Sequence, residues 1–346
     1  MRTCARCGKE WQNDFLHCPH DGQRLDEQAL SAVPVEALFD GRYEILRMLG
    51  EGGTARVFKA LDVKTKQHVA VKVALGKIAR TPPWPERMLR EVALLRSIDH
   101  PNVIRVLGGG QEADGAPFMV MEYLEGETLG EVLRRGDRIP IDVTVSVITD
   151  VARGLSAAHA VGAIHRDIKP DNLFLVPRPG QAPTPKVFDF GMARLSGGSG
   201  LTAKGFILGT PAYMAPEQAV NDLAGPRSDV YALGVVMFRM LTGTLPFSGD
   251  EAELLAHHLY TRPAYPSSRR ADISGDLDAV VLSAMRKLAR NRYPQMSDFV
   301  EDLERVAGKR SGEITADFVA FDDAYEPQTA FSKHVATVLE TKLPPP

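Results

Sequence analysis

Residues 165–175, HRDIKPDNLFL, combine carboxylates, basic side chains and a carboxamide directly before an apolar run. Asp167 can accept a proton from a hydroxyl group, and Lys169 is near enough along the chain to neutralise a moving phosphoryl group. Asn172, together with Asp189 further along the chain, supplies the hard oxygen ligands that Mg²⁺ prefers beside phosphate. This combination predicts transfer of a phosphoryl group from a Mg²⁺-bound nucleotide to an alcohol.

A glycine-rich stretch, LGEGGTARVFKA (residues 49–60), lies between two segments with the pattern of β-strands. Its glycines, at positions 50, 52 and 53, would let backbone N–H groups approach an anion such as phosphate without interference from side chains. An ordinary hairpin turn explains the same glycines equally well when they are considered alone.

Two charged residues occupy positions in otherwise apolar patterns. In VAVKV (residues 69–73), strand alternation places Lys72 on the face opposite the valines. Glu91 lies on the apolar side of a predicted helix, between Met88 and Leu95. Because a buried charge needs a partner, we expect an ion pair between Lys72 and Glu91. The alternative is that both are solvated charges on the surface.

The length, composition and net charge of the chain argue against a nucleic-acid-binding, membrane-spanning or secreted protein. The chain has 346 residues, 44% of them hydrophobic, and a formal net charge of -3. This length favours two or more folding units, and the charge gives no reason to expect nucleic acid or an anionic membrane as a partner. No apolar run reaches the length of a membrane span, and the first residues lack the apolar core of a secretory signal. We therefore expect a cytoplasmic protein.

The order of the predicted elements indicates the fold class. Strand patterns occupy residues 43–73 and return at 118–126, with a helical pattern at 85–98 between them. Beyond Leu129 the patterns are helical. Strands followed by helices predict an α+β protein with a small β-rich lobe and a larger helical lobe. After Gly308 the chain becomes acidic and irregular, which predicts a mostly disordered tail.

All three cysteines lie within the first 18 residues of the chain. Thiolates separated by two residues are typical of tetrahedral zinc sites, and an odd number of cysteines does not suit a disulfide framework. We expect residues 1–25 to form a small zinc-ribbon-like unit with a structural or docking role; a metal-free redox or unstructured arm is the alternative. The expected ligands are Cys4, Cys7 and Cys18, with Asp21 favoured by spacing as the fourth and His17 or His20 also allowed by chemistry.

Further motifs follow in a fixed order, with Asp189-Phe190-Gly191 and then Ala215-Pro216-Glu217 downstream of the polar stretch. With the glycine-rich loop, Lys72 and Glu91, they make the chain from about Tyr43 to Gly308 resemble a eukaryotic-type serine/threonine protein kinase, similar in loop style to the bacterial members. The resemblance implies the two-lobed protein-kinase fold. Its expected parts are a linker (26–42), a β-rich lobe (43–121), a hinge (122–126), a helical lobe (127–308) and a tail (309–346).

The resemblance also implies ATP as the phosphoryl donor and Mg²⁺ or Mn²⁺ as the cofactor. The implied catalytic residues are Asp167, which orients the hydroxyl group, Lys169, Lys72, which holds the α- and β-phosphates, and Glu91, which holds Lys72. The implied magnesium ligands are Asn172 and Asp189. The implied nucleotide contacts are Gly50, Glu51, Gly52, Val57, Ala70, Lys72, Met121, the backbone of Glu122 and Leu124, and Phe174.

Scaffold contacts follow from the same resemblance. Asp229 in SDVYALG is expected to brace the backbone of the catalytic loop, and Arg292 is expected to pair with Glu217. One departure from the family pattern is Ala55, which stands where the third glycine of the loop is usual. We expect this alanine to stiffen the loop slightly without loss of ATP binding.

The implied acceptors are serine and threonine hydroxyl groups of proteins, because Lys169 and Thr210 stand where kinases of this specificity have them. Arg166 precedes Asp167, and such an arginine commonly binds a phosphate. We therefore expect activation by phosphorylation of Thr202, with Ser196 and Ser199 as alternatives, unless that loop is simply flexible.

Two other functions remain open at this point. The first is an ATP-binding scaffold that signals without turnover, and the second is a kinase that acts on small molecules. The scaffold would signal through its zinc unit and tail, and in an active protein kinase either of these could dock partners.

Overall fold

The computed structural model describes residues 2–3, 10–11, 39–52, 55–75, 81–112, 114–136, 138–190, 211–220 and 224–308. The chain divides into two units, residues 1–72 and 73–346, and each is described by itself.

Strands form the described part of the first unit. The short strands β1 (Arg2–Thr3) and β2 (Glu10–Trp11) pair antiparallel. β3 (Tyr43–Glu51) and β4 (Ala55–Asp62) form an antiparallel hairpin. β5 (Gln67–Ala74) continues across the boundary between the units and belongs to a five-stranded sheet with the order β3-β4-β5-β7-β6. The strands predicted between residues 43 and 73 are confirmed.

The second unit begins with a helix packed on two strands. α2 (Trp84–Arg96) buries Met88, Val92 and Leu95, the face expected from their helical spacing. It packs against β6 (Val106–Gln111) and β7 (Pro117–Glu122). A side chain at Gly109 in β6 would place its Cβ 2.5 Å from the Phe118 carbonyl oxygen and 3.1 Å from Val92. Glycine at this position therefore allows the close approach of the helix.

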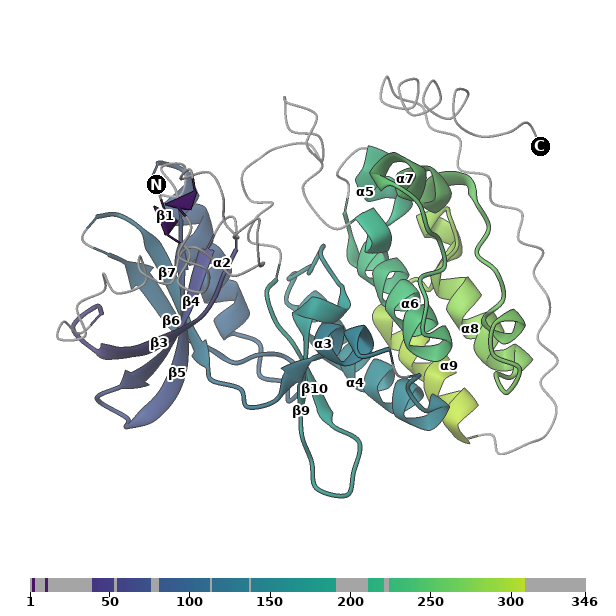
Figure 1. Ribbon diagram of the computed structural model, residues 1–346, viewed down its shortest axis with the longest axis horizontal. Helices are drawn as coiled ribbons and strands as arrows, with labels where there is room; N and C mark the ends of the chain where they lie inside the picture. Colours follow the sequence, from purple (N-terminus) through teal and green to yellow (C-terminus); the bar gives the residue numbers. More distant parts are fainter. Residues whose placement is uncertain are drawn as a thin grey trace. The chain divides into compact units, whose positions relative to one another are not determined.

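Helices dominate the rest of the second unit, as predicted (Figure 1). α6 is buried along almost its whole length and packs against α4, α8 and α9. α6 begins with proline at its first position and ends at Gly243, which has a left-handed φ of 78°. The helices are α3 (Leu129–Arg134), α4 (Ile141–Ala160), α5 (Pro216–Val220), α6 (Pro226–Thr242), α7 (Glu251–Tyr260), α8 (Gly275–Ala284) and α9 (Met296–Gly308).

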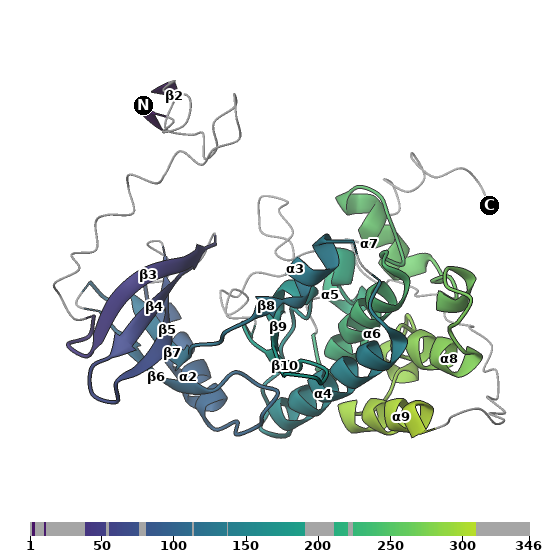
Figure 2. The same ribbon diagram turned by 60° about the horizontal axis from the view of Figure 1, so that its bottom comes forward.

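A small antiparallel sheet lies against α3 and α4 (Figure 2). Its strand order is β10 (Thr184–Val187), β9 (Leu173–Val176), β8 (Glu127–Thr128). Gly126 enters β8 with a φ of 142°, and a Cβ there would lie 2.2 Å from the carbonyl oxygen of Leu175. Because both the φ and the space exclude a side chain, this glycine sets how closely the chain approaches β9.

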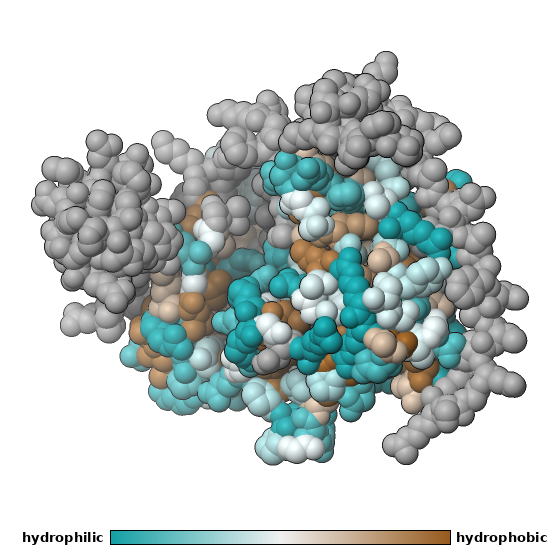
Figure 3. Space-filling view, turned by 45° about the vertical axis from the view of Figure 1, so that its right-hand side comes forward, coloured by the Kyte–Doolittle hydropathy of each residue, from teal (hydrophilic) through white to brown (hydrophobic). Residues whose placement is uncertain are grey.

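The helices in the described part of the chain differ from those that cross membranes. None of the helices there combines the length and the apolar character that a bilayer crossing requires. On the face drawn in Figure 3, hydrophobic residues (brown) are interspersed with hydrophilic ones (teal).

Candidate active site

The polar stretch that opens with His165 forms a loop between α4 and β9, and a carboxylate from α6 holds its backbone. Asp229 is completely buried. Its Oδ2 accepts the backbone N–H of His165 at 2.9 Å, and its Oδ1 accepts that of Arg166 at 2.8 Å. The same carboxylate lies 2.8 Å from Nε2 of His159 on α4. Charge-assisted bonds to buried backbone groups are strong, so this contact fixes the loop, as predicted for Asp229.

His165 connects this loop to the end of β10. Its Nε2 lies 2.9 Å from the carbonyl oxygen of Phe188, and its Nδ1 accepts the backbone N–H of Asp167 at 3.3 Å. Its ring centroid is 4.7 Å from that of Phe190. Because these two hydrogen bonds require a proton on Nε2, the imidazole acts as a neutral buried crosslink. This role of His165 was not predicted from the sequence.

Three of the predicted site residues form one polar cluster on the loop. Lys169 Nζ donates to Asp167 Oδ2 at 2.8 Å. Asn172 Nδ2 donates to the Asp167 carbonyl oxygen at 2.8 Å and to Asp167 Oδ2 at 3.2 Å. Since the amide nitrogen of Asn172 faces Asp167, its Oδ1 points elsewhere and keeps its lone pairs for another partner.

Asp189 lies just beyond the end of β10 and close in space to this cluster. The N–H of Phe188 donates to the carbonyl oxygen of Asn172 at 3.1 Å, which brings the two segments together. Asp189 is exposed and has a φ of 61°, and Arg166 has a φ of 65°. Left-handed backbone at residues other than glycine is uncommon and often marks a functional site.

The donor set at these two residues fits a magnesium ion. An amide oxygen from Asn172 and a carboxylate from Asp189 are hard oxygen ligands, and magnesium usually takes one or two carboxylates with phosphate and water completing its shell. In the part of the chain that the structure describes, no cluster of three or more His, Cys, Asp or Glu side chains could hold a metal without such additional ligands.

The predicted hinge begins at Glu122, the last residue of β7. The Glu122 carboxylate accepts Lys186 Nζ at 2.7 Å and the N–H of Arg105 at 2.8 Å, and the N–H of Glu122 donates to Arg105. The side chain and the N–H of Glu122 are therefore engaged within the protein, and Leu124 lies beyond the end of the strand. Met121, directly before them, is buried.

Phe174 is one of two half-buried residues of β9, in which buried and half-buried residues alternate. Leu173 and Leu175 on either side of it are buried, and its ring lies 6.2 Å from that of Phe188 in an edge-on arrangement. Strand alternation places Phe174 on the opposite face from these leucines. An aromatic surface of this kind suits contact with a flat apolar ligand.

The remaining nucleotide-binding candidates belong to the first unit. Gly50 pairs with Val57 across the β3–β4 hairpin, and Glu51 forms a salt bridge with Arg56 at 3.0 Å. The N–H of Gly52 donates to the carbonyl oxygen of Ala55 at 2.9 Å, which links the ends of β3 and β4. These contacts agree with both earlier interpretations of the glycines, since a hairpin turn and a phosphate loop share this geometry.

Lys72 and Glu91 lie in different units. Ala70 is buried and Lys72 is half-buried on β5, and Glu91 is half-buried on α2. Each side chain has the partial burial expected from its pattern, and the ion pair between them stays a prediction.

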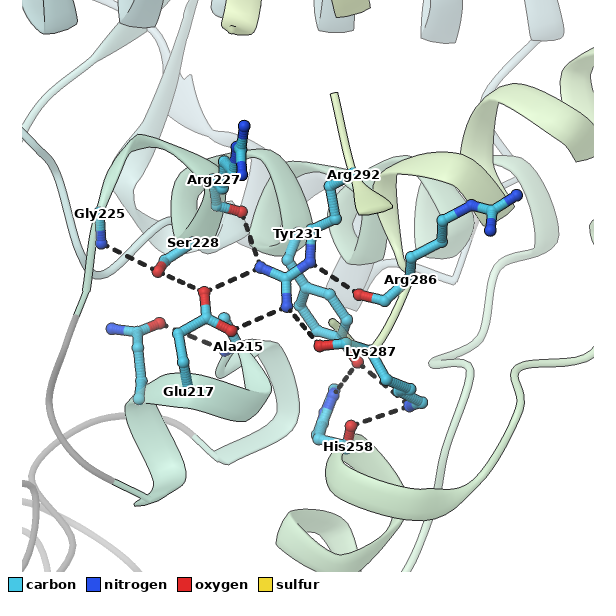
Figure 4. Close-up of polar contacts among 11 residues, drawn as sticks. Ala215, Glu217, Gly225, Arg227, Ser228, Tyr231, His258, Arg286, Lys287 and Arg292 are labelled. Carbon is cyan, nitrogen blue, oxygen red and sulfur yellow. Dashed lines mark hydrogen bonds and ion pairs between the residues drawn. The ribbon is translucent and has the colours of Figure 1, made fainter. Parts of the chain in front are cut away.

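A second buried cluster joins α5, α6 and the segment before α9 (Figure 4). Arg292 donates two parallel hydrogen bonds to the Glu217 carboxylate, at 2.8 and 2.7 Å. Ser228 Oγ donates to the same carboxylate at 2.6 Å. Burial raises the pKa of Glu217, but the Arg292 guanidinium and the Ser228 hydroxyl outweigh this and hold that pKa below its usual value. The predicted pairing of Glu217 with Arg292 is confirmed.

Several predicted residues lie outside the described part of the chain. They are the zinc-ligand candidates Cys4, Cys7, Cys18, Asp21, His17 and His20, the loop residues Gly191, Ser196, Ser199, Thr202 and Thr210, and the tail.

Comparisons with known proteins find one family model and several similar sequences. The family model of the protein kinase domain matches residues 43–303. Serine/threonine-protein kinase PknB of Mycobacterium leprae is 37% identical to the chain over 270 residues, which is 77% of this chain and 43% of PknB. Serine/threonine-protein kinase pkn3 of Myxococcus xanthus is 37% identical over 276 residues, which is 78% of this chain and 50% of pkn3. The chain thus spans about half the length of the curated relatives it matches, or somewhat less.

A solved structure matches the fold as well. The crystal structure of the PknI kinase domain of Mycobacterium tuberculosis has a TM-score of 0.62 to this chain at 25% sequence identity, and it covers 80% of this chain and 100% of that domain. The family match covers more than half of the chain, and the fold has a sheet-rich part followed by a helical part. The chain therefore belongs to the protein kinase family.

Proposed function

We propose that this chain transfers the γ-phosphate of ATP to serine or threonine hydroxyl groups of protein substrates, as part of bacterial signalling. The observation that carries this proposal is the cluster of Asp167, Lys169 and Asn172 on a loop whose backbone is held by Asp229. The relatives from Mycobacterium leprae and Myxococcus xanthus, which bear the name serine/threonine-protein kinase, support the choice of acceptor.

In the proposed reaction, Asp167 orients the acceptor hydroxyl group and takes its proton. Its Oδ2 is already engaged by Lys169 and Asn172, so its Oδ1 is the oxygen that faces the acceptor. Lys169 lies 2.8 Å from this carboxylate and would offset negative charge on the phosphoryl group as it passes. Groups that are already in place when charge develops need no reorganisation, and this lowers the barrier.

Bound magnesium, or manganese in its place, would neutralise charge on the phosphate oxygens. Asn172 Oδ1 and the Asp189 carboxylate are the proposed ligands. Their support is the amide orientation of Asn172, which directs oxygen away from Asp167, and the exposure of Asp189 beside it.

The proposed nucleotide site uses backbone for the adenine and side chains for its ring and phosphates. The carbonyl oxygen of Glu122 and the N–H of Leu124 would bond the adenine edge, with Met121 behind it and Phe174 against its face. From the first unit, the proposed contacts are Gly50, Glu51, Gly52, Val57, Ala70 and Lys72, the last of these held by Glu91.

Transfer of phosphate to a protein acceptor tests the proposal, with Asp167→Asn compared with the wild type. The variant keeps the shape of the side chain but loses the negative charge that takes the proton, so we expect a loss of about 10²-fold or more. Asp171→Asn is the matched control, because Asp171 lies on the same loop but is exposed and pairs with Arg134 at 2.7 Å. This control should stay within about twofold of wild type.

Each other result has a clear meaning. Equal phosphate incorporation by wild type and Asp167→Asn would contradict the proposal and favour an ATP-binding scaffold. Phosphorylation of small alcohols alone would favour a small-molecule kinase. Phosphotyrosine as the product would contradict the choice of serine and threonine.

We further propose that phosphorylation at Thr202, or at Ser196 or Ser199, activates the enzyme by supplying a phosphate to Arg166. Support comes from a cavity of about 280 Å³ that Arg166 lines together with Arg87 and Arg90 of α2. Glu91 is the acidic residue that lines the same cavity. Arginines are suited to bidentate bonds with phosphate. Phosphosite mapping of the fully active enzyme tests this, and an unmodified loop in that enzyme would refute it.

For the N-terminal unit we propose one structural zinc ion, bound by Cys4, Cys7, Cys18 and one of Asp21, His17 or His20. Cysteine spacing alone supports this proposal. Metal analysis should find zinc in the purified chain and much less in a Cys4→Ser/Cys7→Ser variant; zinc-free wild type would contradict it. The cytoplasmic location and docking of partners through this unit stay predictions.

A further inference from the structure

An open pocket on the second unit has an apolar floor and a basic rim. It has a volume of about 600 Å³ and is lined by residues of α3, of the start of α4 and of the connection between β9 and β10. Val143 and Val147 of α4 and Met240 of α6 contribute to the floor. Arg138 and Arg178 contribute to the rim and are exposed. We call this the α3–α4 pocket.

The charges around the α3–α4 pocket are unbalanced. Its charged lining residues are three arginines and one glutamate, and the glutamate is already paired, because Arg135 Nη2 donates to Glu127 Oε1 at 2.9 Å. Among the residues that the structure describes, Arg138 and Arg178 form no salt bridge. Two exposed cations beside an apolar floor suit a ligand that carries both apolar and negative groups.

The chain itself contains a segment with this chemistry. Residues 317–326, DFVAFDDAYE, contain four acidic residues, no basic residue and three aromatic rings. The segment follows α9 in sequence and lies outside the described residues. Its aromatic side chains match the apolar floor of the pocket, and its carboxylates match the arginines of the rim.

The described chain ends close enough for this segment to reach the pocket. Val306 and Ala307, at the end of α9, line a neighbouring cavity together with Asp142 and Val145 of α4. Val143 and Val147 of the same helix line the α3–α4 pocket. The two sites therefore lie on different faces of α4, and a helix is about 10–12 Å across with its side chains. The eight residues 309–316 can span up to about 26 Å, which is enough.

We propose that residues 317–326 dock into the α3–α4 pocket of their own chain. Phe318 and Phe321 occupy the apolar floor, and Asp322 and Asp323 pair with Arg138 and Arg178. This places the acidic segment beside α3 and the β9–β10 connection, on a surface that the proposed catalytic residues do not use.

Limited digestion of the full chain with chymotrypsin measures this docking directly, because the protease cuts after aromatic residues and needs an extended, accessible segment. Cuts after Phe318, Phe321 and Tyr325 are followed by mass spectrometry. In wild type these cuts should be slower than in a free peptide of residues 313–330. The double variant Arg138→Glu/Arg178→Glu should accelerate them by about tenfold, since two ion pairs become repulsive.

Reversal of the charges on both the tail and the pocket tests whether these two surfaces contact each other. Asp322→Lys/Asp323→Lys alone should accelerate cutting, and its combination with Arg138→Glu/Arg178→Glu should restore protection. Arg290→Glu is the matched control, because Arg290 is an exposed arginine outside the pocket, and it should leave the cuts unchanged. The readout does not depend on phosphoryl transfer.

Three outcomes would overturn the proposal. The first is wild-type cutting as fast as that of the free peptide. The second is acceleration by Arg290→Glu equal to that of the pocket variant, which would make the effect one of general charge. The third is protection that rises with protein concentration, which would assign the pocket to the tail of a second copy.

Discussion

Arg292 offers the sharpest test of how the helical part of this chain is stabilised. The five N–H groups of its guanidinium all have partners: the two Glu217 oxygens and the carbonyl oxygens of Arg227, Arg286 and Lys287, all between 2.7 and 2.9 Å. The Arg292 side chain has no exposed surface, and that of Glu217 is 15% exposed. An ion pair so enclosed cannot exchange its partner for water.

Arg292→Met keeps much of the side-chain volume and removes the charge. Glu217 would then keep Ser228 as its remaining side-chain partner in this cluster. Removal of one partner of a buried pair costs about 3–5 kcal/mol, because the other charge stays buried and uncompensated. For a domain of this size each kcal/mol lowers Tm by about 2–4 °C, so we expect a decrease of about 6–20 °C.

The pH dependence of the variant gives a second measure. Without Arg292, burial is the main influence on Glu217 and should raise its pKa above the unfolded value. A carboxyl group whose pKa is raised on folding binds more protons in the folded state, so the stability lost in Arg292→Met should partly return as pH falls towards 4.5. Thermal unfolding followed by circular dichroism at several pH values measures both effects.

Arg305→Met is the control for this experiment. Arg305 pairs with Asp302 at 2.7 Å on the surface of α9, and an exposed pair of this kind contributes about 0–1 kcal/mol. If Arg292→Met lowers Tm no more than Arg305→Met does, the argument from burial and complete hydrogen bonding is wrong. The double variant Glu217→Gln/Arg292→Met should lose less than the sum of the two single variants, because neither member of the pair then carries a charge.

Three further predictions follow from the structure. Gly109→Ala should cost about 1–3 kcal/mol in urea unfolding, because its Cβ would lie 2.5 Å from the Phe118 carbonyl oxygen of β7 and 3.1 Å from Val92 of α2. Gly108→Ala, with nothing within 4 Å, should cost far less, and equal losses would contradict the close packing of β6 against β7 and α2. Burial, and after it the charge of Arg292, lowers the pKa of Lys287 to about 7. Above that pH the unfolded state binds more protons than the folded state, so the free energy of unfolding should rise from about pH 7 to 9.5 relative to that of Lys287→Met. A constant difference between the two proteins over this range would refute the prediction. Asp229→Asn should lower kcat by about 10²-fold, because the catalytic loop would be misplaced, whereas the unfolding midpoint of the strands in the first unit should change little. An unchanged kcat would show that the loop holds its shape without the carboxylate.

The sequence alone was sufficient wherever a pattern is local. Alternation predicted β3 to β5, and helical spacing predicted the face of α2 that carries Met88 and Leu95. The pairing of Glu217 with Arg292 and the contact of Asp229 with the loop were also predicted, although only through resemblance to a family. These two contacts join residues far apart in the chain, and nothing in their spacing encodes them.

Other features depended on the tertiary structure. β6 was not predicted, because the three glycines in VLGGGQ hide the strand pattern; of these, Gly109 is the one whose small size the packing against α2 requires. His165 looks like part of a polar stretch, yet its hydrogen bonds to Phe188 and Asp167 make it a buried crosslink. Strand and helix periods report which way a side chain faces within its own element. They carry no information about which distant backbone group will meet it, and that pairing is decided when the elements pack.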